Sequence, residues 1–322
     1  MMTNLLWLMG AALASWIATG VYLTLARTRG WGKAVRNEGP EAHLEKEGTP
    51  TMGGAPFLLV TLLLAGLWFL VSEDPRPTST ASTLPEGAGW ALLALSLASA
   101  ALGLWDDLSS LARKRGDLAD GKDASTGVLA RWRLLTQSVI ALAFGFWATE
   151  VGVSLFGIPW LDVLGIAFIV VGSINAFNFT DGLDGLAAGV SAIILLAFLV
   201  DPVAAILLGS LLGFLWFNAH PAKLFMGGVG SEALGAAIAG LAILHGDVWR
   251  LPLLALIPVL EVLSVVLQVA YFRATGGKRL FKMSPLHHHF ELSGWPETRV
   301  VVRFWVFTAL AVALAVATRG TT

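Results

Sequence analysis

Ten stretches of predominantly apolar residues alternate with shorter polar segments along the chain. Each is roughly 16 to 23 residues long, close to the about 20 residues that a helix needs to cross a bilayer. They are residues 4–26, 53–72, 88–105, 133–153, 157–176, 185–200, 202–218, 232–247, 251–272 and 300–318. The pattern predicts an all-α polytopic membrane protein with about ten transmembrane helices.

The positions of the basic residues favour ten helices. In that topology five loops on one side collect most of the Lys and Arg residues, and the other side receives Arg76, Arg250 and Arg319. Positively charged loops face the cytoplasm. Merging the sixth and seventh stretches, which only Asp201-Pro202 separates, would move the basic segment 273–303 outside. We therefore expect both termini to be periplasmic and five polar loops to be cytoplasmic.

Composition agrees with a membrane protein. Of the 322 residues, 56% are hydrophobic and 13% are charged, whereas a soluble chain carries about 25% charged residues. The absence of cysteine excludes a disulfide framework and a thiolate metal site. The first apolar stretch lacks a basic flank and a convincing cleavage site, so we expect it to be a retained span. We expect residues 1–322 to form one integral membrane domain, with no nucleic-acid partner.

The third inner loop, Asn175–Gly185, holds two Asp, two Asn, a Thr and two Gly between apolar stretches. Ionisable groups at a membrane face indicate a functional site. Asp181 and Asp184 are three residues apart and would share a face in a helix. The structural alternative is a helix cap made by Thr180 or Asp181. Capping explains one of these residues, so we favour a functional site.

Asp106 and Asp107 form a second polar feature, expected at the cytoplasmic end of the third helix. Adjacent carboxylates repel each other unless a cation relieves them. Mg²⁺ usually binds through one or two carboxylates plus substrate phosphates, so the pair fits phosphoryl chemistry. The alternative is two solvated loop carboxylates that cap the next turn.

Two other inner loops carry weaker signals. The segment Gly48–Gly54 is rich in Gly and Thr. It could present backbone N–H groups that bind a phosphate. The alternative is a turn that precedes close-packed small residues of a membrane helix. Three adjacent histidines, as in His287–His289, rarely bind one metal ion, because neighbouring side chains point in different directions and zinc ligands usually have other spacings. The run better suits hydrogen-bond donors or charge partners near phosphates, and the alternative is a solvated loop.

The ninth stretch carries Glu261, Ser264 and Gln268 on one face, and Pro258 is expected to bend its helix. A Glu in a span is costly unless it is paired or faces a cavity. Interhelical hydrogen bonding and a role in a groove both remain open for this stripe.

Together these motifs resemble the phospho-N-acetylmuramoyl-pentapeptide transferase family, within the polyprenyl-phosphate N-acetylhexosamine-1-phosphate transferases. The resemblance covers essentially the whole chain, and the runs 48–54 and 284–291 are specific to the muramoyl branch. The matching positions are Arg36, Gly39-Pro40, His43, Lys46, Gly48–Gly54, Asp106-Asp107, Gly127 to Gln137, Asn175–Gly189, Phe225-Met226-Gly227, Gly230-Ser231, Glu261 to Gln268 and Ser284–Glu291.

The resemblance implies a homodimeric, Mg²⁺-dependent enzyme of the bacterial inner membrane with a cytoplasmic site. The family transfers phospho-MurNAc-pentapeptide from its UDP carrier to undecaprenyl phosphate, releasing UMP and forming lipid I for peptidoglycan. It implies a polyprenyl groove beside the bent ninth helix. By position, the implied catalytic residues are Asp106, Asp107, His287 and His288, and the implied substrate-binding residues are Lys46, Thr51, Asn178, Asp181, Asp184 and Phe225, with Phe225 stacked on uracil.

Gly228 departs from the family pattern. The family has an Asp there that holds Mg²⁺, so the metal ligands of this chain stay unassigned. Glu232 stands four residues on at a usually apolar position, about 6 Å further along a helix, and Arg133 stands where the family often has Lys. Two readings remain: an active transferase, or a catalytically silent protein that binds the nucleotide sugar or lipid carrier. A transporter would explain the spans but not five polar loops on one face.

Overall fold

The computed structural model describes residues 2–31, 46, 48–72, 84–120 and 126–320, with the backbone alone at 112–120, 126–129 and 320. Arg36, Gly39-Pro40 and His43 lie outside the described residues. So do Lys122 and the side chain of Lys114, the two candidates for the basic residue expected after Asp106-Asp107. The described helices are α1 (Met2–Thr28), α2 (Gly54–Val71), α3 (Ala88–Asp120), α4 (Thr126–Glu150), α5 (Pro159–Thr180), α6 (Leu186–Leu195), α7 (Pro202–Asn218), α8 (Gly228–Leu244), α9 (Leu251–Leu254), α10 (Leu256–Ala274), α11 (Leu286–Glu291) and α12 (Glu297–Ala317), with 3-10 turns at Leu196–Phe198, Val248–Arg250 and Thr318–Gly320.

A helix lies in each of the ten predicted stretches. Six of the described helices are long and apolar enough to cross a membrane, namely α1, α2, α3, α5, α10 and α12, and α6, α7 and α8 are shorter apolar helices. The described part of the chain is therefore an all-helical, polytopic membrane protein. The sixth and seventh stretches are separate helices, because Asp201 caps α7 by accepting the N–H groups of Val203 and Ala204 at 2.8 and 3.1 Å.

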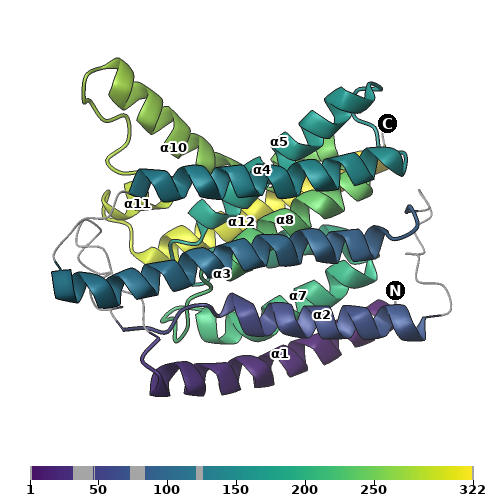
Figure 1. Cartoon of the computed structure of the whole chain (residues 1–322), viewed down its shortest axis with the longest axis horizontal. Helices are drawn as coiled ribbons and strands as arrows, with labels where there is room; N and C mark the ends of the chain where they lie inside the picture. Colours follow the sequence, from purple (N-terminus) through teal and green to yellow (C-terminus); the bar gives the residue numbers. More distant parts are fainter. Residues whose placement is uncertain (1, 32–45, 47, 73–83, 121–125, 321–322) are drawn as a thin grey trace.

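The long helices lie side by side, and Figure 1 shows the start of α1 and the end of α12 at one end of the bundle. The last turns of α3 and the short helix α11 lie at the opposite end (Figure 1). Helix α8 is central, because every one of its residues is buried. It packs against α3 and α5, while α7 packs against α1 and α2. The bundle thus has two ends, and one of them carries the polar loops.

Glycines allow helices to approach the first turn of α8 closely, as small residues do in membrane bundles. A Cβ on Gly103 of α3 would lie 2.2 Å from the carbonyl oxygen of Gly228. A Cβ on Gly54 of α2 would lie 2.3 Å from the backbone nitrogen of Gly230. Helices α2 and α3 are therefore held against the N-terminus of α8 by backbone contact.

Two boundaries differ from the expectation. Helix α3 continues to Asp120, so Asp106 and Asp107 lie within a helix and not at its end, because the polar residues after them extend the helix beyond the apolar stretch. The ninth stretch divides at Ala255 into α9 and α10. Pro258 lies in the first turn of α10, where a missing N–H costs no helical hydrogen bond, so the break precedes the proline.

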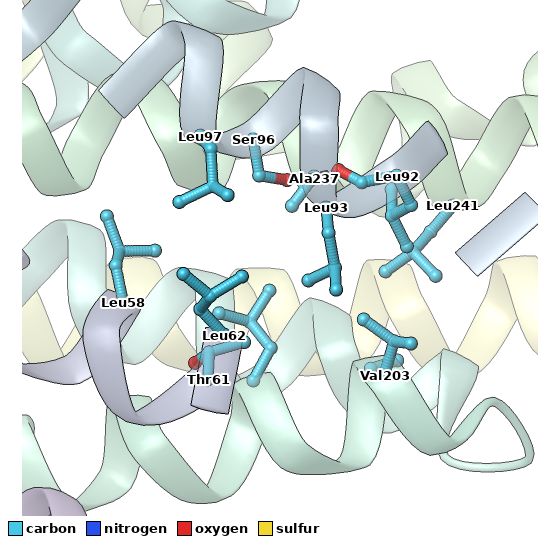
Figure 2. Close-up of a pocket in the computed structure, with 12 residues that line it drawn as sticks. Leu58, Thr61, Leu62, Leu92, Leu93, Ser96, Leu97, Val203, Ala237 and Leu241 are labelled. Atoms are coloured by element: carbon cyan, nitrogen blue, oxygen red, sulfur yellow. Dashed lines mark hydrogen bonds between the residues drawn. The ribbon is translucent and has the colours of Figure 1, made fainter. Parts of the chain in front are cut away.

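A small apolar cavity of about 20 Å³ lies among α2, α3, α7 and α8 (Figure 2). Most of its lining is aliphatic, including Leu58, Leu92 and Val203. The two hydroxyls that line it are bonded within their own helices, Thr61 to the carbonyl of Phe57 and Ser96 to that of Leu92. The cavity therefore offers no free polar group to a nucleotide or a phosphate.

Candidate active site

Most of the polar residues predicted to be functional gather at the end of the bundle that holds the first turn of α8 and the turn between α5 and α6. Five of them fall into two groups in the described part of the chain, together with residues that were not predicted. We call the first the Lys46 cluster: Lys46, Asp184, His220 and Glu297. We call the second the α8 cluster: Asp106, Asp107, Arg133, Asn178 and Glu232.

The Lys46 cluster is centred on a buried carboxylate. Lys46 Nζ lies 2.7 Å from Asp184 Oδ1 and 2.7 Å from Glu297 Oε1. The other oxygen of Asp184 accepts the N–H of Ala222 at 2.9 Å and lies 3.2 Å from His220 Nδ1. Glu297 also accepts the backbone N–H of Asp184 at 2.7 Å. These contacts fix the α5–α6 turn against the start of α12.

The geometry of this cluster also resembles a metal site, because ligand atoms of Asp184, His220 and Glu297 lie within 4.8 Å of one another. The Lys46 ammonium contacts both carboxylates and supplies the positive charge that a metal would otherwise provide. We therefore assign the cluster to an internal ion pair. Sequence reasoning missed His220 and Glu297; the signal for Glu297 was an acidic residue opening a span in an otherwise basic loop.

Asp106 and Asp107 have different partners, which relieves the expected repulsion. Asp107 accepts the N–H groups of Gly228 and Val229, both at 3.1 Å, and so caps the first turn of α8. A carboxylate is favourable there because of the positive end of the helix dipole. The Asp106 side chain is 40% exposed and lies 3.7 Å from Arg133 Nη1. One carboxylate is thus structural and capping, and its neighbour faces the site.

Gly228 lies directly beside this pair. A Cβ at this position would be 3.1 Å from the carbonyl oxygen of Gly103 and 3.5 Å from Asp107 Oδ1. Any side chain here would therefore point into a tight space against the capping carboxylate. Gly228 contributes its backbone N–H, which donates to Asp107, and no side chain.

Glu232 turns inward one helical turn after Gly228 and is fully buried. Its Oε1 lies 3.0 Å from Arg133 Nη2, and its Oε2 accepts a hydrogen bond from Gln137 at 3.2 Å. Arg133 Nη2 also donates to Asn178 Oδ1 at 2.8 Å, and Asn178 donates to Ser231 Oγ at 3.1 Å. The network joins α4, α5 and α8 beneath Asp106.

The histidine run forms α11 and not a solvated loop, because Glu261 reaches it from α10. Glu261 accepts the backbone N–H of His287 at 3.2 Å, and its other oxygen lies 3.2 Å from His287 Nδ1 without hydrogen-bond geometry. His287 is 1% exposed, and a Cβ on Gly182 would lie 2.2 Å from its Nε2. His288 is bonded to Glu291 at 2.8 Å. The Asp181-Gly182 turn therefore rests on His287.

The glycine-rich loop does not present Gly53 and Gly54 to a phosphate. Their N–H groups are bonded to the carbonyls of Phe225 and Met226, at 2.8 and 2.9 Å. The N–H of Phe225 donates to the carbonyl of Pro50 at 2.8 Å. This pairing places half-buried Phe225 against Pro50, the residue before buried Thr51. At Gly53 and Gly54 the structure therefore favours the second interpretation of this loop, a turn before close-packed small residues.

The structure thus joins Lys46 to Asp184, and Asn178 to Asp106 through Arg133. It places Asp181 next to Gly182, the residue that packs against His287. The hypothesis that Thr180 or Asp181 caps α6 is wrong, because the cap position is Gly185 at φ +74°, and Thr180 donates to the carbonyl of Ala176. Gly185 is needed there because its positive φ is unfavourable for other residues.

Comparison with known proteins agrees with this arrangement. A glycosyl transferase family 4 model matches residues 89–246. Proteins named phospho-N-acetylmuramoyl-pentapeptide-transferase are similar along nearly the whole chain. One from Deinococcus radiodurans is 46% identical, covering 94% of this chain and 96% of its own length. One from Deinococcus deserti is 49% identical over 95% and 96%, and one from Pseudarthrobacter chlorophenolicus is 38% identical over 95% of both. The chain therefore belongs to the phospho-N-acetylmuramoyl-pentapeptide-transferase family.

Proposed function

We propose that the chain transfers phospho-MurNAc-pentapeptide from UDP-MurNAc-pentapeptide to undecaprenyl phosphate, releasing UMP and forming lipid I for peptidoglycan synthesis. The observation that carries this proposal is the identity of up to 49% with transferases of that name over nearly their full length. The clustering of acidic, basic and amide side chains at one end of a membrane bundle supports it, because phosphoryl transfer needs positioning and charge neutralisation.

The silent-protein alternative rested on Gly228 alone. The structure gives that residue a defined contact, since its N–H binds Asp107 at 3.1 Å. The Asp106 carboxylate beside it is exposed to the site. The relatives are named as transferases, so the active reading is favoured.

The proposed roles follow the two clusters. Lys46, Thr51, Asp181, Asp184 and Phe225 line the nucleotide site, where Phe225 stacks on the uracil. Asn178, which Arg133 holds by a hydrogen bond within the α8 cluster, also lines the nucleotide site. Asp106 and Asp107 act on the phosphates. His288, which is partly buried and bonded to Glu291, contacts the sugar-phosphate, while buried His287 acts beside it through the turn at Gly182.

Asp106 and Asp107 fit a Mg²⁺ ion that binds through one or two carboxylates plus phosphate oxygens. The exposed Asp106 carboxylate would provide the free ligand, and Asp107 has both oxygens near backbone N–H groups. When bound, the ion would neutralise charge on the phosphates of the substrates.

The proposal includes a location and an assembly. Ten helices, namely α1 to α8, α10 and α12, cross the bacterial inner membrane as a single domain, with both termini periplasmic and the two clusters cytoplasmic. The chain forms a homodimer. The common position of the first and last helix ends supports the shared side of the termini (Figure 1).

The test is UMP release by the purified chain in detergent with both substrates and Mg²⁺. We expect release that stops when EDTA removes the metal and that falls at least 100-fold in Asp106→Asn. An Ala substitution of Ser138, which bonds within α4 and is partly exposed, is the matched control. Nucleotide-sugar binding without release by the unmodified chain would establish the silent alternative.

A further inference from the structure

Three charged groups from three helices meet beneath the proposed phosphate site. Arg133 of α4 lies 3.0 Å from the buried Glu232 of α8 and 3.7 Å from the exposed Asp106 of α3. A single guanidinium therefore bridges a carboxylate inside the bundle and a carboxylate at its surface. The side chain of Arg133 is 24% exposed, so it reaches the surface while it is anchored below.

The donors of Arg133 are divided unequally. Nη2 contacts Glu232 and donates to Asn178 at 2.8 Å. Among the described residues, Nη1 has only the 3.7 Å contact with Asp106, which is longer than a hydrogen bond. The Nε atom is buried without a hydrogen-bond partner. Nη2 is thus held by its hydrogen bond to Asn178 and by the charge of Glu232, whose Oε1 has no hydrogen-bond partner, and Nη1 at the exposed edge is available to a ligand oxygen.

Burying the Glu232 carboxylate has an energetic cost that is best explained by its contact with Arg133. A charged residue inside a membrane helix is costly when unpaired, and every other residue of α8 is apolar, small or a serine. Its partners are Arg133 and Gln137, which come from the same face of α4. A buried ion pair often adds little net stability compared with a packed apolar pair. The carboxylate is therefore better explained by the position it gives to Arg133.

We propose that Glu232 is a positioning residue that holds the Arg133 guanidinium at the mouth of the α8 cluster, where Arg133 binds a phosphate group of the nucleotide sugar. An arginine suits this task because its planar fork matches phosphate oxygens and its charge is permanent. The inference rests on the proposed function. It gives the phosphate site a permanent positive charge, Arg133, and a residue that positions it, Glu232.

The arrangement also accounts for the first turn of α8. Asp107 fills the N-terminal cap, and Gly228 adds no side chain there. The carboxylate of α8 stands one turn deeper, at Glu232. From there it acts on the surface through Arg133 and not by direct contact, because the guanidinium lies between Glu232 and Asp106.

The test measures binding separately from turnover, by calorimetry with UDP-MurNAc-pentapeptide and with uridine. We expect Arg133→Gln to weaken binding of the nucleotide sugar about 10- to 100-fold, the size of a charge-assisted hydrogen bond, and to leave uridine binding unchanged. Arg133→Lys should recover part of the loss. Glu232→Gln, which keeps the shape, should weaken binding of the nucleotide sugar in the same selective way.

A double variant distinguishes positioning from packing. If Glu232 acts through Arg133, Glu232→Gln should cause no further loss in the Arg133→Gln background. Ser173→Ala is the matched control, because it removes a buried α5–α8 hydrogen bond of 2.8 Å without touching Arg133. Equal losses for uridine and the nucleotide sugar, or additive losses in the double variant, would overturn the proposal. Because binding is measured directly, the result stands apart from whether the chain turns over.

Discussion

At the scale of single residues, the site is built from charges that are each paired in a specific way. Lys46 lies between two carboxylates, Asp107 caps a helix, and Arg133 bridges two acids. Removing one partner of a buried charge pair is more costly than removing an exposed one, because the remaining charge stays uncompensated.

Lys46→Met should therefore have two effects. It leaves the buried Asp184 and the half-buried Glu297 without their cation, so the free energy of unfolding should fall by about 3 kcal/mol. It should also abolish UMP binding. Thermal unfolding in detergent and calorimetry measure the two effects. Lys46→Met combined with Glu297→Gln should recover part of the stability, and no recovery would show that the pair is not the origin of the loss.

Gly228→Asp tests the account of the first turn of α8. The new Cβ would lie 3.1 Å from the Gly103 carbonyl oxygen and 3.5 Å from Asp107 Oδ1, so the new charge faces the acidic pair. We expect a less stable protein without Mg²⁺, a larger increase in unfolding temperature when Mg²⁺ is added, and altered turnover. Gly228→Asn matches the size without the charge. Unaltered turnover and an unaltered Mg²⁺ effect would contradict this account.

At the scale of elements, the polar loops are coupled through short contacts between helices. Glu261 of α10 binds the start of α11, and His287 of α11 supports the turn between α5 and α6. Two residues of the polar stripe on α10 thus bind the neighbouring segment, since Gln268 also accepts the N–H groups of Leu280 and Phe281 at 3.0 and 2.8 Å. The third, Ser264, bonds within its own helix.

Gly182→Ala should break this coupling. Its Cβ would lie 2.2 Å from His287 Nε2, so either the imidazole or the Asp181-Gly182 turn must move. We expect kcat to fall about 10- to 100-fold, as small misplacements of catalytic groups do, and the unfolding temperature to fall as well, because buried His287 has little room to move away. Gly172→Ala, with open space around its Cβ, is the control. A wild-type kcat would show that this contact does not position the turn.

The elements were largely predictable, and the contacts of the site were not. Apolar length located a helix in each stretch, because a membrane imposes that length. The sequence also placed Lys46 and Asp184 in one site by resemblance. It did not reveal that the Gly53 and Gly54 N–H groups are paired, or that His287 is buried. Those facts depend on which segments meet in space, and residue spacing carries no information about partners far apart in the chain.

At the scale of the whole molecule, the proposal assigns ten helices to the membrane, with both termini outside. The chain contains no cysteine, so single cysteines can report on each side. A cysteine at Thr3 should react with an impermeant maleimide in cells with a permeabilised outer membrane. A cysteine at Lys278 should react only after the inner membrane is opened. The reverse pattern would invert the topology and place the site on the wrong side for a UDP-linked substrate.

The central claim is transfer of phospho-MurNAc-pentapeptide to a lipid phosphate. The most direct measurement follows where a label on this group goes. The purified chain, reconstituted in vesicles with undecaprenyl phosphate and Mg²⁺, would receive UDP-MurNAc-pentapeptide labelled in the peptide. We predict that the label enters the lipid phase in amounts equal to the UMP released, and that it returns to the aqueous phase when excess UMP reverses the reaction. UMP release with all label remaining water-soluble would mean hydrolysis, and no release at all would mean a silent binding protein; either result would contradict the account.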